Sequence, residues 1–228
     1  DAYLANDRTL ADPQVIAVEP GGRVLLRVIN GAAATVFWID TGHLRSALVA
    51  VDGKPIQPRA GWRVGLAMGQ RADLLLEIPR EGGAFPILAL REGARERAGL
   101  LLATRGASIA RIPLLGDQPA EAFDATQEMR LQAVRGLAAR PAGAVLHVTL
   151  DGTMTPYVWA IDDRPWGQHK ALDVEGGRRI ELIMENRSMM AHPMHLHGHT
   201  FQVVQIGDRR FAGAVRDTVH VPAHQRVV

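Results

Sequence analysis

The sequence contains no cysteine among its 228 residues. Disulfide bonds and cysteine-based zinc sites are therefore excluded, and so is any thiolate metal ligand supplied from within this chain. Lysine is also scarce, since Lys54 and Lys170 are the only two, and the remaining basic side chains are arginines. Lysine and arginine together exceed aspartate and glutamate only by 26 to 24. Because no basic block stands out, nucleic acid is not expected as a partner.

Long apolar segments are missing as well, since no run approaches the roughly eighteen residues that a membrane-spanning helix needs. Asp1 does not begin a signal peptide, so we expect the chain as given neither to span a membrane nor to carry its own export signal. Apolar residues occur in short runs bounded by glycine, proline and aspartate, for example at 24–29, 74–78 and 180–184. Helical periodicity is weak, and the pattern predicts an all-β protein built from sandwiches.

Part of the sequence is repeated at an offset of 156 residues. Residues 18–30 align with residues 174–186 without a gap, and six of the thirteen positions are identical. At the same offset Tyr3 falls on Trp159. Further along, after a slip of one residue, the segment beginning at Val64 matches the segment beginning at Val219. The repeat predicts two copies of one β-domain.

A segment rich in proline, alanine and aspartate separates the two copies. We predict a first domain at residues 1–106, a linker at residues 107–127 and a second domain at residues 128–228. The first copy continues for about thirty residues beyond Arg71, whereas the second stops two residues after the matching Arg226. The second domain is therefore expected to be incomplete at its C-terminus, and the first is expected to lack its opening strands.

Four histidines lie within eight residues, in the segment His-Pro-Met-His-Leu-His-Gly-His that starts at His192. Imidazole is the commonest metal ligand, and ligand softness admits zinc, copper, iron or nickel. In an extended strand His195, His197 and His199 would line one side, while Pro193 would interrupt regular pairing and let His192 turn toward a different centre. The cluster is predicted to bind metal.

The repeat assigns different roles within the cluster. Extending the offset sets Val36 against His192 and Ile39 against His195, so only the second copy carries ligands. His199 has a histidine counterpart in the first copy, which has no such site. We therefore expect His199 to support the structure.

The motif at residues 192–199, preceded by Asn-Arg-Ser-Met-Met-Ala and followed by Thr-Phe, resembles the first ligand motif in the last domain of multicopper oxidases, the family of laccases and bacterial periplasmic copper oxidases. Residues 3–77, with Asp-Gly-Lys-Pro at 52–55 and Gly-Gln-Arg-Ala-Asp at 69–73, look like the copper-free middle domain of a three-domain member. The resemblance implies two cupredoxin-like Greek-key β-sandwich domains, the second truncated at its C-terminus.

The same resemblance implies a role for each of three histidines. His192 would bind the type 1 copper, where electrons enter, while His195 would bind the type 2 copper and His197 one of the type 3 coppers of a cluster that reduces dioxygen to water. The family's remaining ligands, including a cysteine thiolate, would come from other segments of the same protein or from another chain. The expected partners are dioxygen and a phenol, an aromatic amine or a cuprous ion, in the periplasm or outside the cell. The chain alone is expected to be inactive.

Two other functions stay open on the sequence alone. His192, His195 and His197 could hold a single ion in a non-catalytic copper or zinc module, and three histidines with one water also suit a catalytic zinc site. The histidines could instead be relics in a structural pair of β-sandwiches. A His-Cys-His continuation downstream would favour the oxidase, whereas a stop codon after Val228 would favour the module.

The side chains around the cluster have simpler expected roles. Three methionines beside an apolar strand are expected to pack against the protein: Met189, Met190 and Met194. Asp217 could orient a ligating imidazole, although a carboxylate at a strand end, in a turn or an ion pair, is the simpler interpretation. His220 and His224 lie near a predicted strand and turn and are expected to be exposed.

Overall fold

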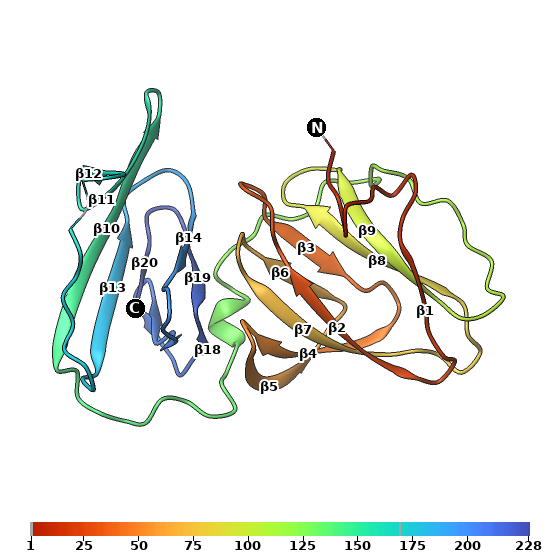
Figure 1. Cartoon of the computed structure of the whole chain (residues 1–228), viewed down its shortest axis with the longest axis horizontal. Helices are drawn as coiled ribbons and strands as arrows, with labels where there is room; N and C mark the ends of the chain where they lie inside the picture. Colours follow the sequence, from red (N-terminus) through yellow and green to blue (C-terminus); the bar gives the residue numbers. More distant parts are fainter. Residues whose placement is uncertain (1, 169) are drawn as a thin grey trace. The chain divides into compact units, whose positions relative to one another are not determined.

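The computed structural model describes residues 2–168 and 170–228 and divides into two compact units, one ending at Phe123 and the other beginning at Asp124 (Figure 1). Within the described residues the only helix is one 3-10 turn, η1 (Glu128–Arg130), so the predicted all-β class is confirmed. None of the described residues belongs to a helix long and apolar enough to cross a membrane.

The first unit contains two sheets (Figure 1). The five-stranded sheet has the order β1–β9–β8–β3–β6, formed by β1 (Val15–Ala17), β9 (Arg97–Ala103), β8 (Ala84–Arg91), β3 (Phe37–Asp40) and β6 (Arg63–Leu66). The four-stranded sheet has the order β2–β7–β4–β5, formed by β2 (Arg23–Ile29), β7 (Arg71–Glu77), β4 (Arg45–Val51) and β5 (Lys54–Ala60).

Alternation of side chains along the strands creates the core of this unit. In β7, Ala72, Leu74 and Leu76 are at most 1% exposed, while the residues between them are less buried. Successive side chains of a strand point to opposite faces, so one face of the sheet is apolar. Leu66 and Leu101 of the other sheet are equally buried, as expected for a sandwich.

The second unit contains one large sheet and two strand pairs. The large sheet has the order β12–β11–β10–β13–β20–β16–β17, formed by β12 (Arg164–Pro165), β11 (Tyr157–Ile161), β10 (Ala144–Met154), β13 (Ile180–Asn186), β20 (Arg226–Val227), β16 (Gln205–Ile206) and β17 (Arg209–Arg210). The pairs are β14 (His192–His195) with β19 (Thr218–Val221), and β15 (Phe201–Gln202) with β18 (Val215–Arg216). Their shared core includes Val148, Met184, Val203 and Val219.

The segment predicted as a linker, residues 107–127, lies mostly against the first unit. Ala120 forms an isolated β-bridge with Glu92. The Trp38 indole N–H donates to the Glu121 carbonyl at 2.9 Å. The division between the two units falls inside the segment, close to its end.

The repeat is visible in the strand pairing, with one correction. Phe37 lies opposite Leu66 in the first unit, and His192 lies opposite Val221 in the second. Because the sequence match already equates Leu66 with Val221, the residue equivalent to His192 is Phe37, whereas the ungapped alignment had placed Val36 there. The loop between the asparagine and the strand is one residue shorter in the second unit. The sequence offset between the two units is therefore 156 residues before the loop and 155 after it.

The same pairing equates His195 with Asp40, in place of Ile39. Asp40 lies opposite Arg63 and forms an ion pair with it, with 2.7 Å between Asp40 Oδ2 and an Arg63 amino nitrogen. His195 lies opposite Thr218. A cross-strand ion pair in one unit therefore corresponds to an imidazole–hydroxyl pair in the other.

In each unit a buried asparagine forms hydrogen bonds that hold the corresponding loop in place. Asn30 donates from its amide nitrogen to the carbonyls of Thr35 and Leu66 at 2.9 and 2.8 Å, and its amide oxygen accepts from the Ala32 N–H at 3.0 Å. Asn30 thus joins the end of the loop, at Thr35, to Leu66 of the neighbouring strand β6. Buried polar groups of this kind are stabilising only when their hydrogen bonds are made.

Asn186 makes the equivalent bonds in the second unit. Its amide nitrogen donates to the carbonyls of Met190, Val221 and Pro222 at 2.7, 3.2 and 3.0 Å, and its amide oxygen accepts from the Ser188 N–H at 2.9 Å. The loop that leads into the histidine cluster is therefore held by hydrogen bonds between Asn186 and the backbone.

Candidate metal centre

Strand β14 carries only the first two histidines of the cluster. The strand ends at His195, and the chain then turns, with Gly198 at φ 70° and the His199 N–H 3.4 Å from the Leu196 carbonyl. The prediction that one extended strand aligns His195, His197 and His199 is therefore wrong. Glycine at a positive φ makes the turn possible without steric strain.

Pro193 does not interrupt the pairing of β14, contrary to the sequence prediction. It lies inside the strand, opposite His220. Leu196 donates its N–H to the Asp217 carbonyl on the β19 side at 3.0 Å, so by alternation the nitrogen of Pro193 faces the other edge. At that edge proline removes no hydrogen bond from the β14–β19 ladder.

His192 is held by an aromatic ring and a hydroxyl. Its ring lies edge-to-face with Trp159, with 5.1 Å between centroids, as the ring of its equivalent Phe37 does with Tyr3 at 5.4 Å. The Nε2 atom of His192 lies 2.7 Å from Ser188 Oγ. Desolvation lowers the pKa of His192, which favours the neutral imidazole that binds metal.

The neighbours of Ser188 hold its hydroxyl in place. Ser188 Oγ lies 2.8 Å from Asn186 Oδ1 and 2.9 Å from the Met190 carbonyl, and both can accept its single hydrogen. The contact with Ser188 engages Nε2 of His192 and not Nδ1.

His195 is hydrogen-bonded through its other ring nitrogen, Nδ1. Its Nδ1 atom lies 3.0 Å from the Asp217 carbonyl and 3.0 Å from Thr218 Oγ1, whose own hydrogen is donated to Asp217 Oδ1. Both partners are acceptors, so Nδ1 of His195 carries the hydrogen and Nε2 carries the lone pair. Asp217 therefore contacts His195 through its backbone carbonyl, and its carboxylate lies 3.4 Å from the same nitrogen.

His197 lies beside His195 in the turn, with 4.7 Å between ring centroids and an interplanar angle of 71°. The Nδ1 atom of His199 donates to the His197 carbonyl at 3.0 Å. His195, His197 and His199 are all exposed. The contact of His199 is with the backbone of the turn, and its supporting role stays a prediction.

The two ligand candidates of β14 are three positions apart and so point to opposite faces of the strand. Across residues 2–168 and 170–228, no group of three or more histidine, aspartate or glutamate side chains is arranged to hold a metal ion. In the same residues β14 pairs with β19 alone, whereas its equivalent β3 pairs with both β6 and β8. The edge of β14 that faces away from β19 is thus open.

A hollow of about 500 Å³ lies beside β14. Its lining is mainly apolar and includes Trp159, Leu182 and Phe201, together with the histidines His192 and His195. Both imidazoles therefore border space that another part of a protein or a ligand could occupy.

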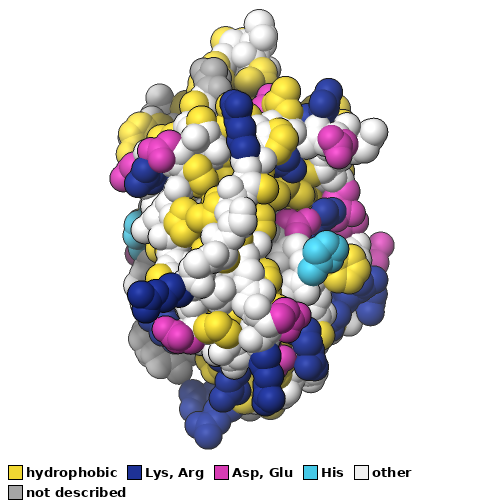
Figure 2. All heavy atoms as spheres, turned by 90° about the vertical axis from the view of Figure 1, so that its right-hand side faces the viewer, with side chains coloured by type: hydrophobic (Ala, Val, Ile, Leu, Met, Phe, Trp, Pro, Cys, Tyr) yellow, Lys and Arg dark blue, Asp and Glu magenta, His cyan; other side chains and the backbone are white. Residues whose placement is uncertain are grey.

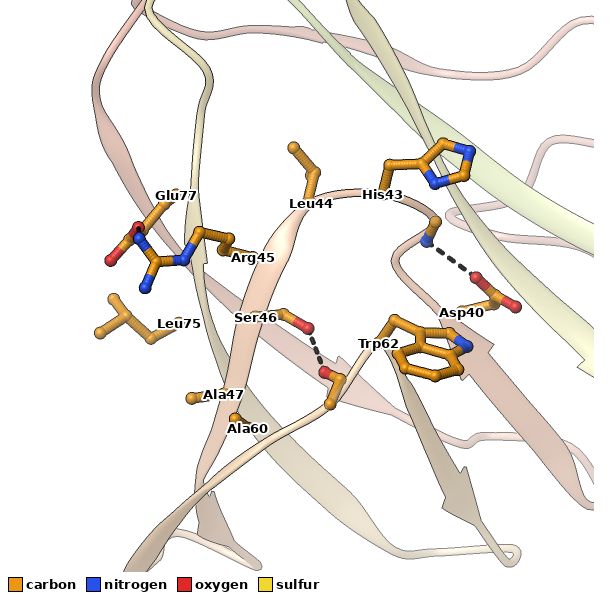
Figure 3. Close-up of a pocket in the computed structure, with 12 residues that line it drawn as sticks. Asp40, His43, Leu44, Arg45, Ser46, Ala47, Ala60, Trp62, Leu75 and Glu77 are labelled. Carbon is orange, nitrogen blue, oxygen red and sulfur yellow. Dashed lines mark hydrogen bonds and ion pairs between the residues drawn. The ribbon is translucent and has the colours of Figure 1, made fainter.

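A larger hollow, of about 890 Å³, lies in the first unit (Figure 3). Its polar side chains are bonded to nearby groups: Asp40 accepts from the Gly42 N–H, Ser46 donates to the Gly61 carbonyl, and Arg45 pairs with Glu77 at 3.3 Å. His43 and the exposed Trp62 complete the rim. The donors do not converge on one point as a metal site requires.

The surface of the chain mixes charges of both signs. On the face shown in Figure 2, basic side chains gather toward the lower end, with acidic ones among them and apolar or uncharged groups between. This mixture agrees with the near balance of 26 basic and 24 acidic residues.

Three side chains near the cluster differ in exposure from the sequence prediction. His220 is only 8% exposed, because it faces inward from β19, where all four residues are buried. Met189 and Met190 are 81% and 44% exposed, so the prediction that they pack is wrong for both; Met194 does pack against the core. The expected exposure of His224 is confirmed.

The chain is similar to a known family and to curated proteins. Profiles described as multicopper oxidase match residues 139–228 and residues 1–107. The chain is 35% identical over 226 residues to the multicopper oxidase MmcO of Mycobacterium tuberculosis (strain ATCC 25618 / H37Rv), covering 99% of this chain and 44% of that protein. It is 31% identical over 117 residues to copper resistance protein A of Escherichia coli, covering 51% of this chain and 19% of that protein.

Among solved structures, the laccase from Botrytis aclada superposes with a TM-score of 0.72 at 18% identity, covering 94% of this chain and 47% of that one. This likeness confirms the predicted fold of cupredoxin-like β-sandwich domains. The chain spans less than half the length of the curated relatives named above.

Proposed function

The chain belongs to the multicopper oxidase family, and on that premise we propose that its second unit supplies three copper ligands of an oxidase. His192 is assigned to the type 1 copper, where electrons enter, His195 to the type 2 copper and His197 to one type 3 copper. The first unit, with Phe37 and Asp40 at the equivalent positions, is assigned as the copper-free domain.

The observation that carries this assignment is that the two imidazoles of β14 are hydrogen-bonded through opposite ring nitrogens, Nε2 of His192 to Ser188 and Nδ1 of His195 to Thr218 and the Asp217 carbonyl. We infer that Nδ1 of His192 and Nε2 of His195 are the nitrogens that bind copper. The two side chains leave opposite faces of one strand. This geometry supports two separate centres joined by a short stretch of backbone and argues against one shared ion.

Copper, when bound, would supply one-electron redox chemistry and the binding of dioxygen. The chain's own residues hold the ligands in place: Ser188 and Trp159 orient the ring of His192, and Thr218 orients that of His195. Because desolvation lowers the pKa of His192, this ring stays neutral and available to metal at physiological pH.

We assign to the complete protein the coupling of one-electron oxidation of a phenol, an aromatic amine or a cuprous ion to four-electron reduction of dioxygen to water. The likeness to a protein named for copper resistance supports cuprous ion as one substrate and a periplasmic or secreted location. The chain alone is proposed to be inactive, because its described residues do not gather three metal ligands and the sequence has no thiolate.

The alternative, a non-catalytic copper or zinc module, requires the histidines at 192–199 to converge on one ion. The opposite orientations of His192 and His195 and the lack of a three-ligand group in the described part of the chain speak against it. An intact module would bind one ion per chain with at least three histidines.

Copper analysis and optical spectroscopy of this chain and of a longer protein with its flanking domains test the proposal. The chain with copper should be colourless, and the longer protein should show the strong thiolate-to-copper absorption band. In the longer protein, His192→Phe, which introduces the first unit's residue, should remove that band, and His195→Asn should leave it. A band in the isolated chain, or its survival in His192→Phe, would refute the assignment.

A further inference from the structure

Three aromatic rings of the second unit lie in series between its surface and the proposed electron-entry ligand. The ring of Tyr157 lies edge-to-face with that of Trp159, with 5.7 Å between centroids, and Trp159 lies in the same way against His192, at 5.1 Å. Trp159 and His192 are partly buried and line the hollow of about 500 Å³. Tyr157 lies outside the lining of that hollow and is 72% exposed. The series therefore begins in solvent and ends at His192.

The fold keeps the middle ring in place. Trp159 belongs to β11 and lies opposite Gly152 of β10, and Tyr157, two residues earlier, points to the same face of the strand. A Cβ atom at Gly152 would lie 2.0 Å from Cε3 of the Trp159 indole, so the ring occupies the space that any other residue would fill. Gly152 therefore lets the indole lie across the neighbouring strand.

The first unit shares the inner ring contact and differs at the outer one. Its equivalents of Trp159 and His192 are Tyr3 and Phe37, whose ring centroids lie 5.4 Å apart. The Arg91 guanidinium lies over the ring of Tyr3, 5.6 Å from its centroid. A cation over an aromatic face attracts the electrons of the ring and so makes their removal harder. The ring beside the ligand position thus meets a positive charge in the first unit and a tyrosine in the second.

We propose that Tyr157 is a second point of electron entry, at which phenols too bulky for the hollow beside His192 are oxidised. The inference rests on the proposed function, because it needs the copper assigned to His192 as the electron acceptor. Phenol and indole rings give up one electron far more readily than the ring of phenylalanine, so Tyr157 and Trp159 can each carry the charge in turn. Two short steps between touching rings replace one long step from the surface.

The oxidation balances as a transfer of hydrogen atoms at the surface. The Tyr157 phenol loses one electron, through Trp159 and His192, to the copper assigned there, and one proton to the surrounding water. The phenolic substrate then gives a hydrogen atom to the Tyr157 oxygen and leaves as a phenoxyl radical. Four such oxidations supply the four electrons and four protons that convert one dioxygen into two waters.

Pulse radiolysis with azide radicals tests the ring series in the chain itself, without copper. Azide radicals oxidise tryptophan, and the two most exposed tryptophans, Trp62 and Trp166, are first replaced by phenylalanine so that they do not compete. The tryptophan radical absorption should then decay as the tyrosine radical absorption grows. The rate should not depend on protein concentration, because the transfer is intramolecular.

Substitution of each tyrosine identifies the acceptor of this charge, since the chain contains only two. Tyr157→Phe, which removes one exposed hydroxyl and keeps the ring, should slow the growth of the tyrosine radical at least about tenfold. Tyr3→Phe is the matched control and should leave it unchanged. If the parent forms no tyrosine radical by this route, or if Tyr3→Phe removes it while Tyr157→Phe does not, the proposed ring series is wrong.

The longer protein separates this entry point from the proposed function. The same phenol is offered free in solution and attached to a soluble polymer that cannot enter the hollow. Tyr157→Phe should lower the ratio of kcat/KM for the attached phenol to that for the free phenol at least about tenfold, and Tyr3→Phe should not. An unchanged ratio in Tyr157→Phe would refute the entry point. A longer protein that oxidises neither form would refute the proposed function, while the radical transfer within the chain would stand.

Discussion

Breaking the buried ion pair between Glu128 and Arg216 is expected to destabilise the second unit strongly. Glu128, in η1, is 8% exposed, and Arg216, at the end of β18, is 2% exposed; an Arg216 amino nitrogen contacts Glu128 Oε2. Arg216 precedes Asp217, whose carbonyl accepts from His195. The pair thus holds the segment that orients a proposed copper ligand.

The size of the effect follows from burial. Arg216→Met leaves a carboxylate without its guanidinium in a site that excludes water, which costs about 3–5 kcal/mol of unfolding free energy. Replacing both partners, in Arg216→Met with Glu128→Leu, removes both charges and should restore most of that loss, because a buried ion pair itself adds little net stability. The coupling free energy between the two changes should therefore exceed about 2 kcal/mol.

Hydrogen exchange of peptides that cover β10, followed in denaturant, measures the unfolding free energy of the second unit. The exposed pair Arg226–Asp208, at 3.2 Å, is the control, and Arg226→Met should cost less than about 1 kcal/mol. If Arg216→Met costs no more than that control, or if the double variant is as unstable as the sum of the single variants, the reasoning about the buried pair is refuted.

Three further predictions concern the second unit. Burial, with a smaller contribution from His192 and Arg216, lowers the pKa of His220 to about 4. The folded state therefore binds fewer protons than the unfolded state below pH 6.5, and the unfolding free energy should fall by about 2 kcal/mol between pH 7 and pH 5. In urea unfolding, the unfolding free energy of His220→Gln should depend less steeply on pH, and an equal dependence would contradict the assignment. Asn186→Ala should lower the unfolding free energy of its unit by about 2–4 kcal/mol in urea titrations, because three carbonyls lose a donor; a loss under about 1 kcal/mol would show that the loop is not braced this way. Ser188→Ala should shift the ring hydrogen of His192 partly to Nδ1, visible in ¹⁵N NMR of the imidazole, and an unchanged tautomer would exclude Ser188 as its cause.

The sequence was sufficient for the all-β architecture, and its metal ligands His192, His195 and His197 stay predictions. Alternating apolar residues predicted the strands, and the offset repeat predicted two related domains. The exact residue equivalences between the two units could not be read from the sequence, because the loop before β14 is one residue shorter than its counterpart. This difference shifts the alignment of every residue in the following strand by one. Only the cross-strand register equates His192 with Phe37, and the matching edge-to-face contacts with Trp159 and Tyr3 agree with it.

The residues that orient the imidazoles could not have been identified from sequence. Ser188 and Thr218 are ordinary hydroxyl residues in the sequence, and their roles are visible only from their contacts with His192 and His195. The burial of His220 depends on which face of β19 meets the core. A comparison of Ser188 with Ala32 would have been the one available signal, since the hydroxyl occurs only in the unit that carries the histidines.

The asparagine-braced loop has a consequence for how such proteins evolve. Since Asn30 and Asn186 hold the same backbone with or without histidines, a duplicated domain can gain or lose a ligand by single substitutions, such as Phe37→His with Ala32→Ser, while it stays above the stability threshold that selection enforces. The first unit therefore offers a folded backbone on which such ligands can be introduced by substitution.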